Sequence, residues 1–464
     1  MIWTIRKAAV IGSGTMGGGI AALLTGVGIE TLLLDIPARD SKPGDPAQQR
    51  NAVALAGIER LRSASPTPLF DPADADKIQI GNLEDDLGQV ADCDWIIEVV
   101  VERLDVKQSL MSRLASVARP DALISTNTSG LPIAQISAHL DADFRHRFMG
   151  THFFNPPRYL HLLEIIPGAE TDPVLVRAFV EFAEKTLGKG VVICKDTPNF
   201  IGNRFLTLIG MQTVNAALDG GYTVEEIDTL TGTLIGRPRS ASFRLLDIIG
   251  IDVFHQIARN LHPAIPHDPA RTLLEHPGAN ALFARLIEKG WLGSKSGQGF
   301  YKTIKNDAGE REFWSLDLNT FEYLPPRKPL FDSVTRHAQT ADTGARIRAL
   351  FNENDRAADF LRRHLAFYLA YASQRIPEIA DSLVSIDNAQ KWGFSHELGP
   401  FEIWDALGVA ESLPQFEALG FPAADWVKTM LDQGFESFYQ REDGQIVGVY
   451  SPADRAYHPI GGGS

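Results

Sequence analysis

The sequence predicts an α/β protein in which a doubly wound, mostly parallel sheet is followed by a mostly helical region made of two tandem repeats. Three observations predict this fold. Apolar runs of strand length alternate with helical stretches in the first part of the chain, which is typical of a parallel sheet covered on both faces. The strand pattern stops after Pro198, and the remainder reads as helices. Segments of that helical part then recur further along the chain.

A glycine-rich turn follows the first predicted strand, residues 7–11, and opens a helix that runs to about Gly28. The turn carries G-x-G-x-x-G at Gly12, Gly14 and Gly17. The first glycine permits the tight turn, the second lets the backbone approach a pyrophosphate, and the third lets the helix pack close to the strand. The amides at the start of the helix would then face the anion, so the turn indicates a dinucleotide site.

A carboxylate ends the second predicted strand, residues 31–34. Asp35 stands close to the expected distance of roughly 20 residues from the turn for the acid that binds an adenosine ribose. Its charge would repel a 2'-phosphate, so the sequence favours NAD over NADP, although Arg39 lies close enough to weaken that preference. A glycine turn without a ligand is the alternative. Strand, turn, helix and acid together favour a Rossmann-type NAD-binding domain instead.

Polar residues follow the predicted strands at the edge where such sheets bind ligands. Buried strands are predicted at residues 95–101, 122–125 and 191–194. Their carboxyl ends, and the end of a short strand at 148–150, are expected at the same edge of the sheet. The residues just past these ends are Glu102, Lys107, Asn127, Ser129 and His152.

A histidine and a carboxylate are predicted to meet on neighbouring strands. His152 follows the strand at 148–150, and Glu164 lies in a strand at 162–166 that would run back alongside it. A buried carboxylate that fixes the imidazole tautomer makes histidine a general base for a hydroxyl group. Alternatively, the histidine caps a strand and the glutamate is solvated. These residues alone do not distinguish the two interpretations. The glycine turn at the N-terminus favours the catalytic one.

The composition restricts the partners and the compartment. A net charge of -14 argues against nucleic acid or an anionic membrane as the main partner. Cys93 and Cys194 are far apart, and no clustered ligand set indicates a metal. No apolar run reaches the length of a membrane span. The first strand begins a few residues after Met1, which leaves no room for a leader peptide, so we expect a cytoplasmic protein without membrane insertion.

The helical part is predicted to be duplicated. The segment 225–228 and the run 244–250 have counterparts at 384–387 and 401–408, and a predicted hairpin follows each set. Dense prolines near residues 325–329 forbid a continuing helix there. The expected domains are 1–195 for NAD binding, 196–325 and 326–460 for the helical repeats, and a linker-like tail at 461–464.

Together these motifs resemble the L-3-hydroxyacyl-CoA dehydrogenases of fatty acid β-oxidation. The resemblance runs in order over the first 300 residues, and its matching stretches are residues 10–17, 97–107, 125–129, 151–156 and 195–204. The duplicated helical region is similar to that of multifunctional β-oxidation proteins, in which a dehydrogenase is fused to an enoyl-CoA hydratase. No hydratase domain is recognisable in these residues.

The resemblance implies oxidation of (S)-3-hydroxyacyl-CoA to 3-oxoacyl-CoA with NAD, with a hydratase domain or a thiolase as further partners. A non-catalytic NAD-binding protein of the same fold, and a dehydrogenase of another small hydroxy acid, are the alternatives. The implied catalytic residues are His152, Glu164, Ser129 and Asn203, with Ser129, Asn155 and Asn203 on the substrate side. The implied NAD-binding residues are Gly12, Gly14, Thr15, Met16, Gly17, Asp35, Glu102, Lys107, Asn127 and Lys295.

Two of these residues, Ser129 and Lys295, also have a purely structural interpretation. A turn-forming role after Asn127 accounts for Ser129 as well as a substrate contact does, and a solvated position on a loop accounts for Lys295 as well as a cofactor contact does.

The helical repeats are expected to pair within the chain, as two subunits do in single-copy relatives. The residues expected at that contact are Leu206, Ile209, Leu245, Leu246 and Ile249 in the first repeat and Phe367, Leu369, Ile403, Trp404 and Leu407 in the second.

Overall fold

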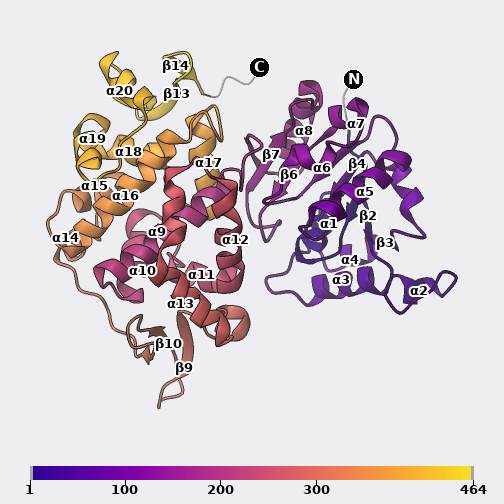
Figure 1. Cartoon of the computed structure of the whole chain (residues 1–464), viewed down its shortest axis with the longest axis horizontal. Coiled ribbons are helices and arrows are strands. Elements are labelled where there is room, and N and C mark those ends of the chain that lie inside the picture. The colour runs from indigo at the N-terminus through magenta and orange to yellow at the C-terminus, as the bar shows by residue number, and fades with distance from the viewer. Residues whose placement is uncertain (1–3, 461–464) are drawn as a thin grey trace. The chain divides into compact units, whose positions relative to one another are not determined.

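A computed structural model describes residues 4–460 of the chain. The linker-like tail expected at 461–464 lies outside the described residues. The chain divides into two compact units, Met1–Phe200 and Ile201–Ser464. In Figure 1 the first unit runs from indigo to magenta and the second from magenta to yellow.

The first unit contains one eight-stranded sheet with the order β3-β2-β1-β4-β5-β6-β7-β8. Neighbouring strands are parallel except β6 and β7, which are antiparallel. The predicted doubly wound, mostly parallel sheet is therefore confirmed, and its strand order reverses between β1 and β4, where such sheets bind nucleotides. The strands are β1 (Lys7–Ile11), β2 (Glu30–Asp35), β3 (Gln79–Asn82), β4 (Trp95–Glu98), β5 (Leu123–Thr126), β6 (Phe148–Phe153), β7 (Leu162–Pro167) and β8 (Gly190–Ile193).

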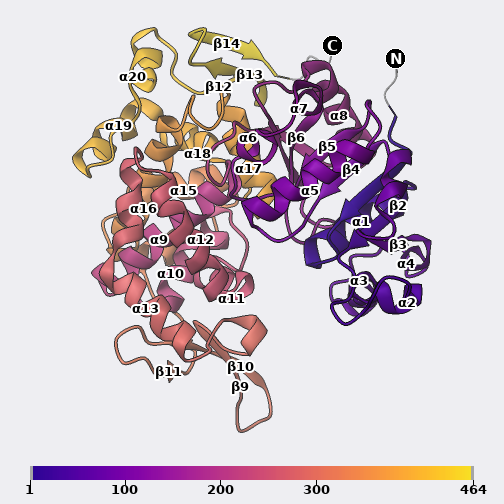
Figure 2. The same cartoon turned by 45° about the vertical axis from the view of Figure 1, so that its right-hand side comes forward.

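Helices flank this sheet, and α1 and α3 lie beside the strands β1–β3 (Figure 2). Trp95 of β4 is fully buried against Phe179 and Phe182, with ring centroids 5.0 and 6.2 Å away, so α8 is anchored to the sheet by aromatic packing. The helices are α1 (Thr15–Gly26), α2 (Ala47–Arg50), α3 (Ala52–Ser63), α4 (Asp74–Lys77), η1 (Leu87–Asp92), α5 (Leu104–Val117), α6 (Ile133–Ser137), α7 (Ala142–His146) and α8 (Pro173–Lys185).

The second unit is mostly helical, as predicted, and each half ends in a small antiparallel sheet. The first half contains α9 (Gly202–Gly220), α10 (Val224–Thr231), η2 (Thr233–Ile235), α11 (Phe243–Ile249), α12 (Ile251–Ala264), η3 (Pro269–Glu275), α13 (Pro277–Glu288), η4 (Ser294–Ser296), β9 (Tyr301–Lys305), β10 (Arg311–Leu316) and β11 (Tyr323–Leu324). The second half contains α14 (Asp332–His337), α15 (Thr343–Phe351), α16 (Arg356–Gln374), α17 (Leu383–Phe394), α18 (Pro400–Leu407), α19 (Val409–Ala418), α20 (Asp425–Asp432), β12 (Tyr439–Glu442), β13 (Gln445–Ser451) and β14 (Ala456–Pro459).

Each half contains a tyrosine–aspartate hydrogen bond at the corresponding place. Tyr301 Oη donates to Asp228 Oδ2 over 2.7 Å, and Tyr439 Oη donates to Asp387 Oδ2 over 2.6 Å. Each aspartate also accepts backbone N–H groups at the start of the following helix, α11 or α18. The same set of hydrogen bonds therefore connects corresponding elements in both halves, which supports the predicted tandem repeat.

A second aspartate repeats this correspondence. Asp247 accepts hydrogen bonds from the backbone N–H groups of Phe300 and Tyr301, and Asp405 accepts them from those of Phe438 and Tyr439. The distances lie between 2.8 and 3.0 Å. In both halves the carboxylate satisfies the backbone where the terminal sheet begins, which explains why these residues recur at the same relative places.

The repeats contact each other within the chain, through α9 and α16. Phe205 packs against Tyr368 and Tyr371, with ring centroids 6.0 and 5.4 Å away. The expected residue set was wrong in part, because Trp404 packs on Phe416 and on the ring of Phe438 in its own repeat. The helix α11, which carries Leu245, Leu246 and Ile249, packs on α10, α12 and η4 of the first half.

Candidate active site

The glycine turn joins β1 to α1 in the way its sequence predicts. Gly12 has a φ of 110°, and a Cβ there would collide with the carbonyl of Val99. A Cβ on Gly17 would collide with the carbonyl of Gly12, so both positions require glycine. Gly14, at the N-cap of α1, has open space where a Cβ would stand. The turn is therefore tightly packed at Gly12 and Gly17 and open at Gly14, which fits the approach of a pyrophosphate to Gly14.

Asp35 lies beside this turn at the end of β2. Its Oδ2 accepts hydrogen bonds of 2.6 Å from both the backbone N–H and the hydroxyl of Ser13. Arg60 of α3 donates to the carbonyl of Ser13 over 2.7 Å, and so braces the same turn. The expected ribose-binding carboxylate and the glycine turn thus form one connected structure. Thr15 and Met16 are the first two residues of α1, at the same place.

His152 and Glu164 face each other across neighbouring strands. The antiparallel register of β6 and β7 pairs the two residues directly, as expected. His152 Nδ1 lies 2.8 Å from Glu164 Oε1, and the carboxylate is fully buried. A carboxylate only accepts hydrogen bonds, so Nδ1 carries a proton and Nε2 is left as the basic nitrogen.

The surroundings of this pair are apolar and fix the imidazole. The rings of Phe154 and Phe200 lie 4.6 and 5.6 Å from the ring of His152, centroid to centroid. The thiol of Cys194, just after β8, donates to Glu164 Oε2 over 3.3 Å. The second carboxylate oxygen is therefore bound from the opposite side, and little freedom remains for Glu164 to turn away from the histidine.

The loop after β5 is held by Glu102. Its Oε1 accepts a short hydrogen bond from the hydroxyl of Thr128 and longer ones, of 3.3 Å, from the backbone N–H groups of Gly130 and Leu131. Ser129 lies within this loop and is half-buried. The expected cofactor residue Glu102 thereby also positions the expected substrate residue Ser129.

Lys107 is more deeply placed than a direct cofactor contact requires. Its side chain is 1% exposed, and its ammonium lies 2.6 Å from Glu98 Oε1 and 3.4 Å from Glu102 Oε2. The other oxygen of Glu98 accepts from the hydroxyl of Thr126. This buried network ties β4, β5 and α5 together below the loop at 127–131. The structure places Lys107 behind Glu102. A direct contact between Lys107 and the cofactor stays a prediction.

The remaining expected residues are distributed over both units. Asn127 Oδ1 accepts from the backbone N–H of Phe153 and so fixes the end of β6 next to the catalytic histidine. Asn155 is exposed in the loop after β6. Asn203 is the second residue of α9, and Lys295, in η4, pairs with Asp252 at 2.6 Å. These last two belong to the second unit.

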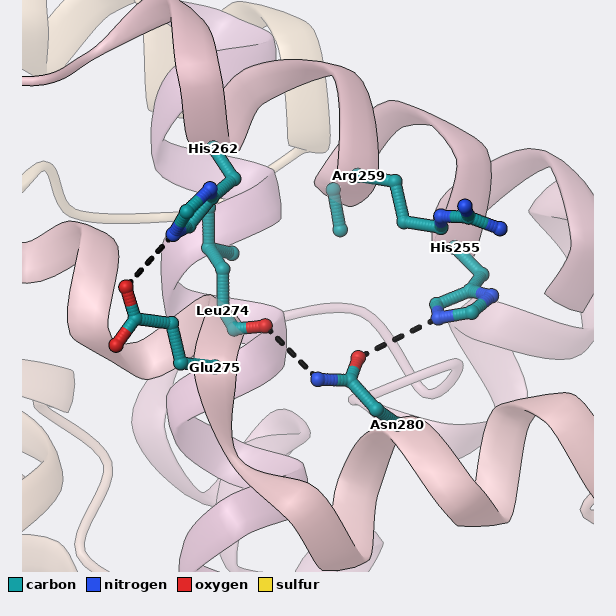
Figure 3. A pocket seen from close by; sticks show the side chains of 7 residues that line it. His255, Arg259, His262, Leu274, Glu275 and Asn280 are labelled. Atoms are coloured by element: carbon teal, nitrogen blue, oxygen red, sulfur yellow. Dashed lines mark hydrogen bonds and ion pairs between the residues drawn. The ribbon is translucent and has the colours of Figure 1, made fainter.

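A separate pocket of about 410 Å³ lies in the helical unit, between α12, η3 and α13 (Figure 3). Four of its polar side chains form two pairs: His262 with Glu275 at 2.7 Å and His255 with Asn280 at 3.4 Å. None of the residues expected at the active site lines it. We therefore assign the pocket no part in the chemistry.

Residues 4–460 contain no group of three or more histidine, cysteine, aspartate or glutamate side chains that could hold a metal ion. No helix among them is long and apolar enough to cross a bilayer.

Glu98 and Cys194 support the site but were given no role from the sequence. Glu98 offered a signal, because a charged residue within an apolar strand is buried only when it is paired. Cys194 offered none. A thiol in an apolar strand reads as a packing residue, and its bond to Glu164 depends on the pairing of β7 with β8.

Family models match most of the chain. The model described as 3-hydroxyacyl-CoA dehydrogenase, NAD binding domain, matches residues 7–197, and the model for the C-terminal domain of 3-hydroxyacyl-CoA dehydrogenase matches residues 200–303. The second match lies within the first of the two predicted repeats.

Individual relatives agree with these models. The chain is 43% identical over 450 residues to a probable 3-hydroxyacyl-CoA dehydrogenase of Bacillus subtilis, which covers 95% of this chain and 56% of that protein. It is 44% identical over 313 residues to a probable 3-hydroxyacyl-CoA dehydrogenase of Deinococcus radiodurans, covering 67% of this chain and 86% of that protein. The chain thus spans little more than half the length of the B. subtilis relative.

A solved structure shares the fold. The dehydrogenase part of multifunctional enzyme 1 from Caenorhabditis elegans has a TM-score of 0.58 with 21% identity, covering 92% of this chain and 89% of that one. At this identity the likeness concerns the fold alone.

Proposed function

The chain belongs to the 3-hydroxyacyl-CoA dehydrogenase family, and on that premise we propose that it oxidises (S)-3-hydroxyacyl-CoA to 3-oxoacyl-CoA with NAD. The match of residues 7–197 to the NAD-binding domain model confirms the expected cofactor. The observation that carries the proposal is the His152–Glu164 pair, because it supplies the one group that oxidation of an alcohol requires from the protein. That group is a base whose imidazole is oriented by a buried carboxylate.

NAD, when bound, accepts the hydride that leaves the hydroxyl-bearing carbon. The chain's own residues handle the proton. His152 Nε2 takes the proton of the hydroxyl group, and the imidazole becomes a cation. The fully buried Glu164 then forms a charge-assisted bond of 2.8 Å to the imidazolium Nδ1–H. The pair lowers the barrier because its attraction is strongest when the histidine carries charge.

The other residues bind and orient. Gly12, Gly14 and Gly17 form the pyrophosphate cradle with the first turn of α1, and Asp35 accepts the ribose hydroxyls in place of Ser13. Ser129 donates its hydroxyl hydrogen bond to the substrate oxygen in this proposal, and Asn203 is the second donor. Asn155, Asn127 and Lys295 complete the substrate and cofactor contacts in this proposal.

The test is the rate of NADH formation with 3-hydroxybutyryl-CoA and with a longer 3-hydroxyacyl-CoA, and of NADH consumption with acetoacetyl-CoA. Turnover of the CoA thioesters supports the proposal. Turnover of free 3-hydroxybutyrate at a comparable kcat/KM would instead make the protein a dehydrogenase of a small hydroxy acid. NAD binding without any turnover would make it a non-catalytic NAD-binding protein.

The same proposal includes the setting of the reaction. A hydratase domain or a thiolase is the expected partner, because a hydratase makes the 3-hydroxyacyl thioester and a thiolase cleaves the 3-oxoacyl thioester. We place the protein in the cytoplasm, where the thiols of its two buried cysteines would stay reduced.

A further inference from the structure

Arg237 is a buried cation without a counter-charge. It follows η2 in the loop before α11, and its side chain is 8% exposed. Its Nη1 donates to His364 Nε2 over 2.9 Å. The other two guanidinium nitrogens, Nε and Nη2, are buried and have no hydrogen-bond partner among residues 4–460. No carboxylate of these residues forms an ion pair with it, so the charge of Arg237 is not neutralised by the chain.

The histidine that holds Arg237 is itself neutral. Nδ1 of His364 lies 3.0 Å from Gln212 Oε1, an acceptor, so this nitrogen carries the proton and Nε2 accepts from Arg237. Burial, and then the charge of Arg237, hold the pKa of His364 well below its usual range. His364 therefore orients the guanidinium and adds no charge. Gln212 lies on α9 and His364 on α16, so the contact joins the two repeats.

Two further polar groups beside Arg237 are also unused. The guanidinium carbon of Arg237 lies 5.3 Å from the centre of the Tyr368 ring, and the buried Tyr368 hydroxyl has no hydrogen-bond partner within residues 4–460. The same is true of Nδ1 of His396, after α17. Burial, followed by the charge of Arg237, lowers the pKa of His396 well below its usual range. Side chains from both repeats thus keep unsatisfied polar atoms around one cation.

Such a charge is costly unless something compensates it. Arginine does not lose its proton in proteins, so Arg237 cannot become neutral as a buried lysine would. Buried water would satisfy the hydrogen bonds but would leave the charge uncompensated. A large ligand is excluded, because Tyr368 is 1% exposed and His364 is fully buried. The remaining candidate for the compensating group is a small ion with one negative charge.

We propose that Arg237, oriented by His364 and flanked by the hydroxyl of Tyr368, binds one small monovalent inorganic anion of the halide class between the two helical repeats. Chloride is the available ion of this class in cells. The bound anion accepts hydrogen bonds from the two unused guanidinium nitrogens and neutralises the guanidinium. Because its ligands come from both repeats, the bound anion links the first repeat to the second. None of these ligands is among the residues proposed for the dehydrogenase reaction.

The direct test is a crystal structure of the whole chain grown with sodium bromide, with data collected at the bromine absorption edge. An anomalous peak at hydrogen-bond distance from Nε or Nη2 of Arg237 is the expected result. An ordered density there without anomalous signal at saturating bromide would identify water and overturn the proposal. The experiment uses the wild-type chain, so it decides the question even if a variant at this position fails to fold.

The solution test distinguishes a stabilising site from an adventitious ion. Thermal unfolding of wild type, R237Q and R239Q is followed while sodium gluconate is replaced by sodium chloride at constant ionic strength. Arg239 is exposed two residues away, so R239Q removes the same charge without touching the site. Chloride should raise the Tm of wild type and R239Q by a few degrees and leave that of R237Q unchanged. An equal chloride response in R237Q, or none in wild type, would exclude the site. Sodium phosphate in place of chloride should not reproduce the effect, because a larger, more highly charged anion does not match the single buried charge.

Discussion

Nδ1 of His152 lies 2.8 Å from Oε1 of Glu164, and the two residues are direct partners across β6 and β7. The contact is a consequence of strand register, because cross-strand partners on the same face of a sheet lie side by side. A slip of one residue in β7 would turn Glu164 to the other face and leave the histidine without its carboxylate. The sheet therefore specifies the tautomer of the base.

Removing the base should abolish turnover. We expect His152→Gln to lower kcat by orders of magnitude, on the order of 10²–10⁴-fold, because proton transfer in the transition state is lost. The affinity for NAD, measured by fluorescence titration of NADH, should hardly change. His139→Gln, on an exposed histidine of the same unit, serves as the control. Full activity of His152→Gln would refute the assigned mechanism.

Removing the carboxylate should slow the reaction. Glu164→Gln keeps an acceptor for Nδ1 but no longer compensates the imidazolium charge that forms in the transition state, so kcat should fall. Cys194→Ala, which removes only the thiol bond to Glu164, should lower kcat by a smaller factor. A kcat of Glu164→Gln equal to that of wild type would contradict the role of Glu164.

The cofactor preference should depend on Asp35. Because its carboxylate stands where a 2'-phosphate would have to lie, kcat/KM with NAD should exceed that with NADP. Asp35→Asn removes the repulsive charge. The ratio of kcat/KM with NAD to kcat/KM with NADP should therefore fall by about tenfold, which corresponds to about 1.4 kcal/mol. Equal kcat/KM values for the two cofactors in the wild type would show that Asp35 does not select between them.

The buried pair below the loop at 127–131 should matter for stability. Lys107→Met leaves the carboxylate of Glu98 buried without its cation, and breaking a buried pair in this way costs about 3–5 kcal/mol. Chemical denaturation should report this loss. The exposed pair of Lys185 and Glu181 provides the control, because Lys185→Met should leave the denaturation midpoint almost unchanged. Equal losses in the two variants would mean that burial of the Glu98–Lys107 pair has no energetic consequence.

Much of this site could be predicted from the sequence, because its parts depend on local patterns. The glycine turn is local, and His152 and Glu164 lie on strands joined by a short connection, so their pairing follows from the strand pattern. The Glu98–Lys107 pair was not predicted, since a charged residue in a strand does not reveal which helix covers it. The contact between the repeats was predicted with a residue set that was wrong in part, because apolar character alone does not select a packing partner. Trp404 is as apolar as Phe205, yet it packs within its own repeat.

The repeated aspartates should make the helical unit less stable as pH rises. Burial raises the pKa of Asp405 to about 7 and that of Asp247 to about 6. A carboxyl group whose pKa is higher in the folded than in the unfolded state binds its proton more tightly when folded, so its contribution to stability is present at low pH. That contribution is lost as pH rises from about 4, the unfolded value, through about 7.

The measurement is the free energy of unfolding at pH 5.5 and at pH 8, for wild type and for Asp405→Asn. Asparagine resembles the protonated acid, so the variant should lose less stability than wild type between the two values. The difference should be of the order of a few kcal/mol. The exposed Asp425→Asn is the control. Parallel pH dependence in Asp405→Asn and wild type would mean that Asp405 does not titrate in this range.

The last prediction concerns the contact between the repeats. Phe205 on α9 packs on Tyr368 and Tyr371 of α16, and the buried guanidinium of Arg204 bonds Tyr371 Oη at 2.9 Å and Asp268 Oδ2 at 2.7 Å. This apolar and polar contact lies within one chain, so we expect that it does not drive homodimerisation. Phe205→Asp would place an unpaired charge in the contact and should unfold the helical unit rather than dissociate an oligomer. Circular dichroism with size-exclusion chromatography and light scattering separates these outcomes. Ile248→Asp, on a side chain that is 57% exposed, is the matched control. A Phe205→Asp variant that stays folded and halves the mass of the wild-type particle would show that α9 pairs with a second chain.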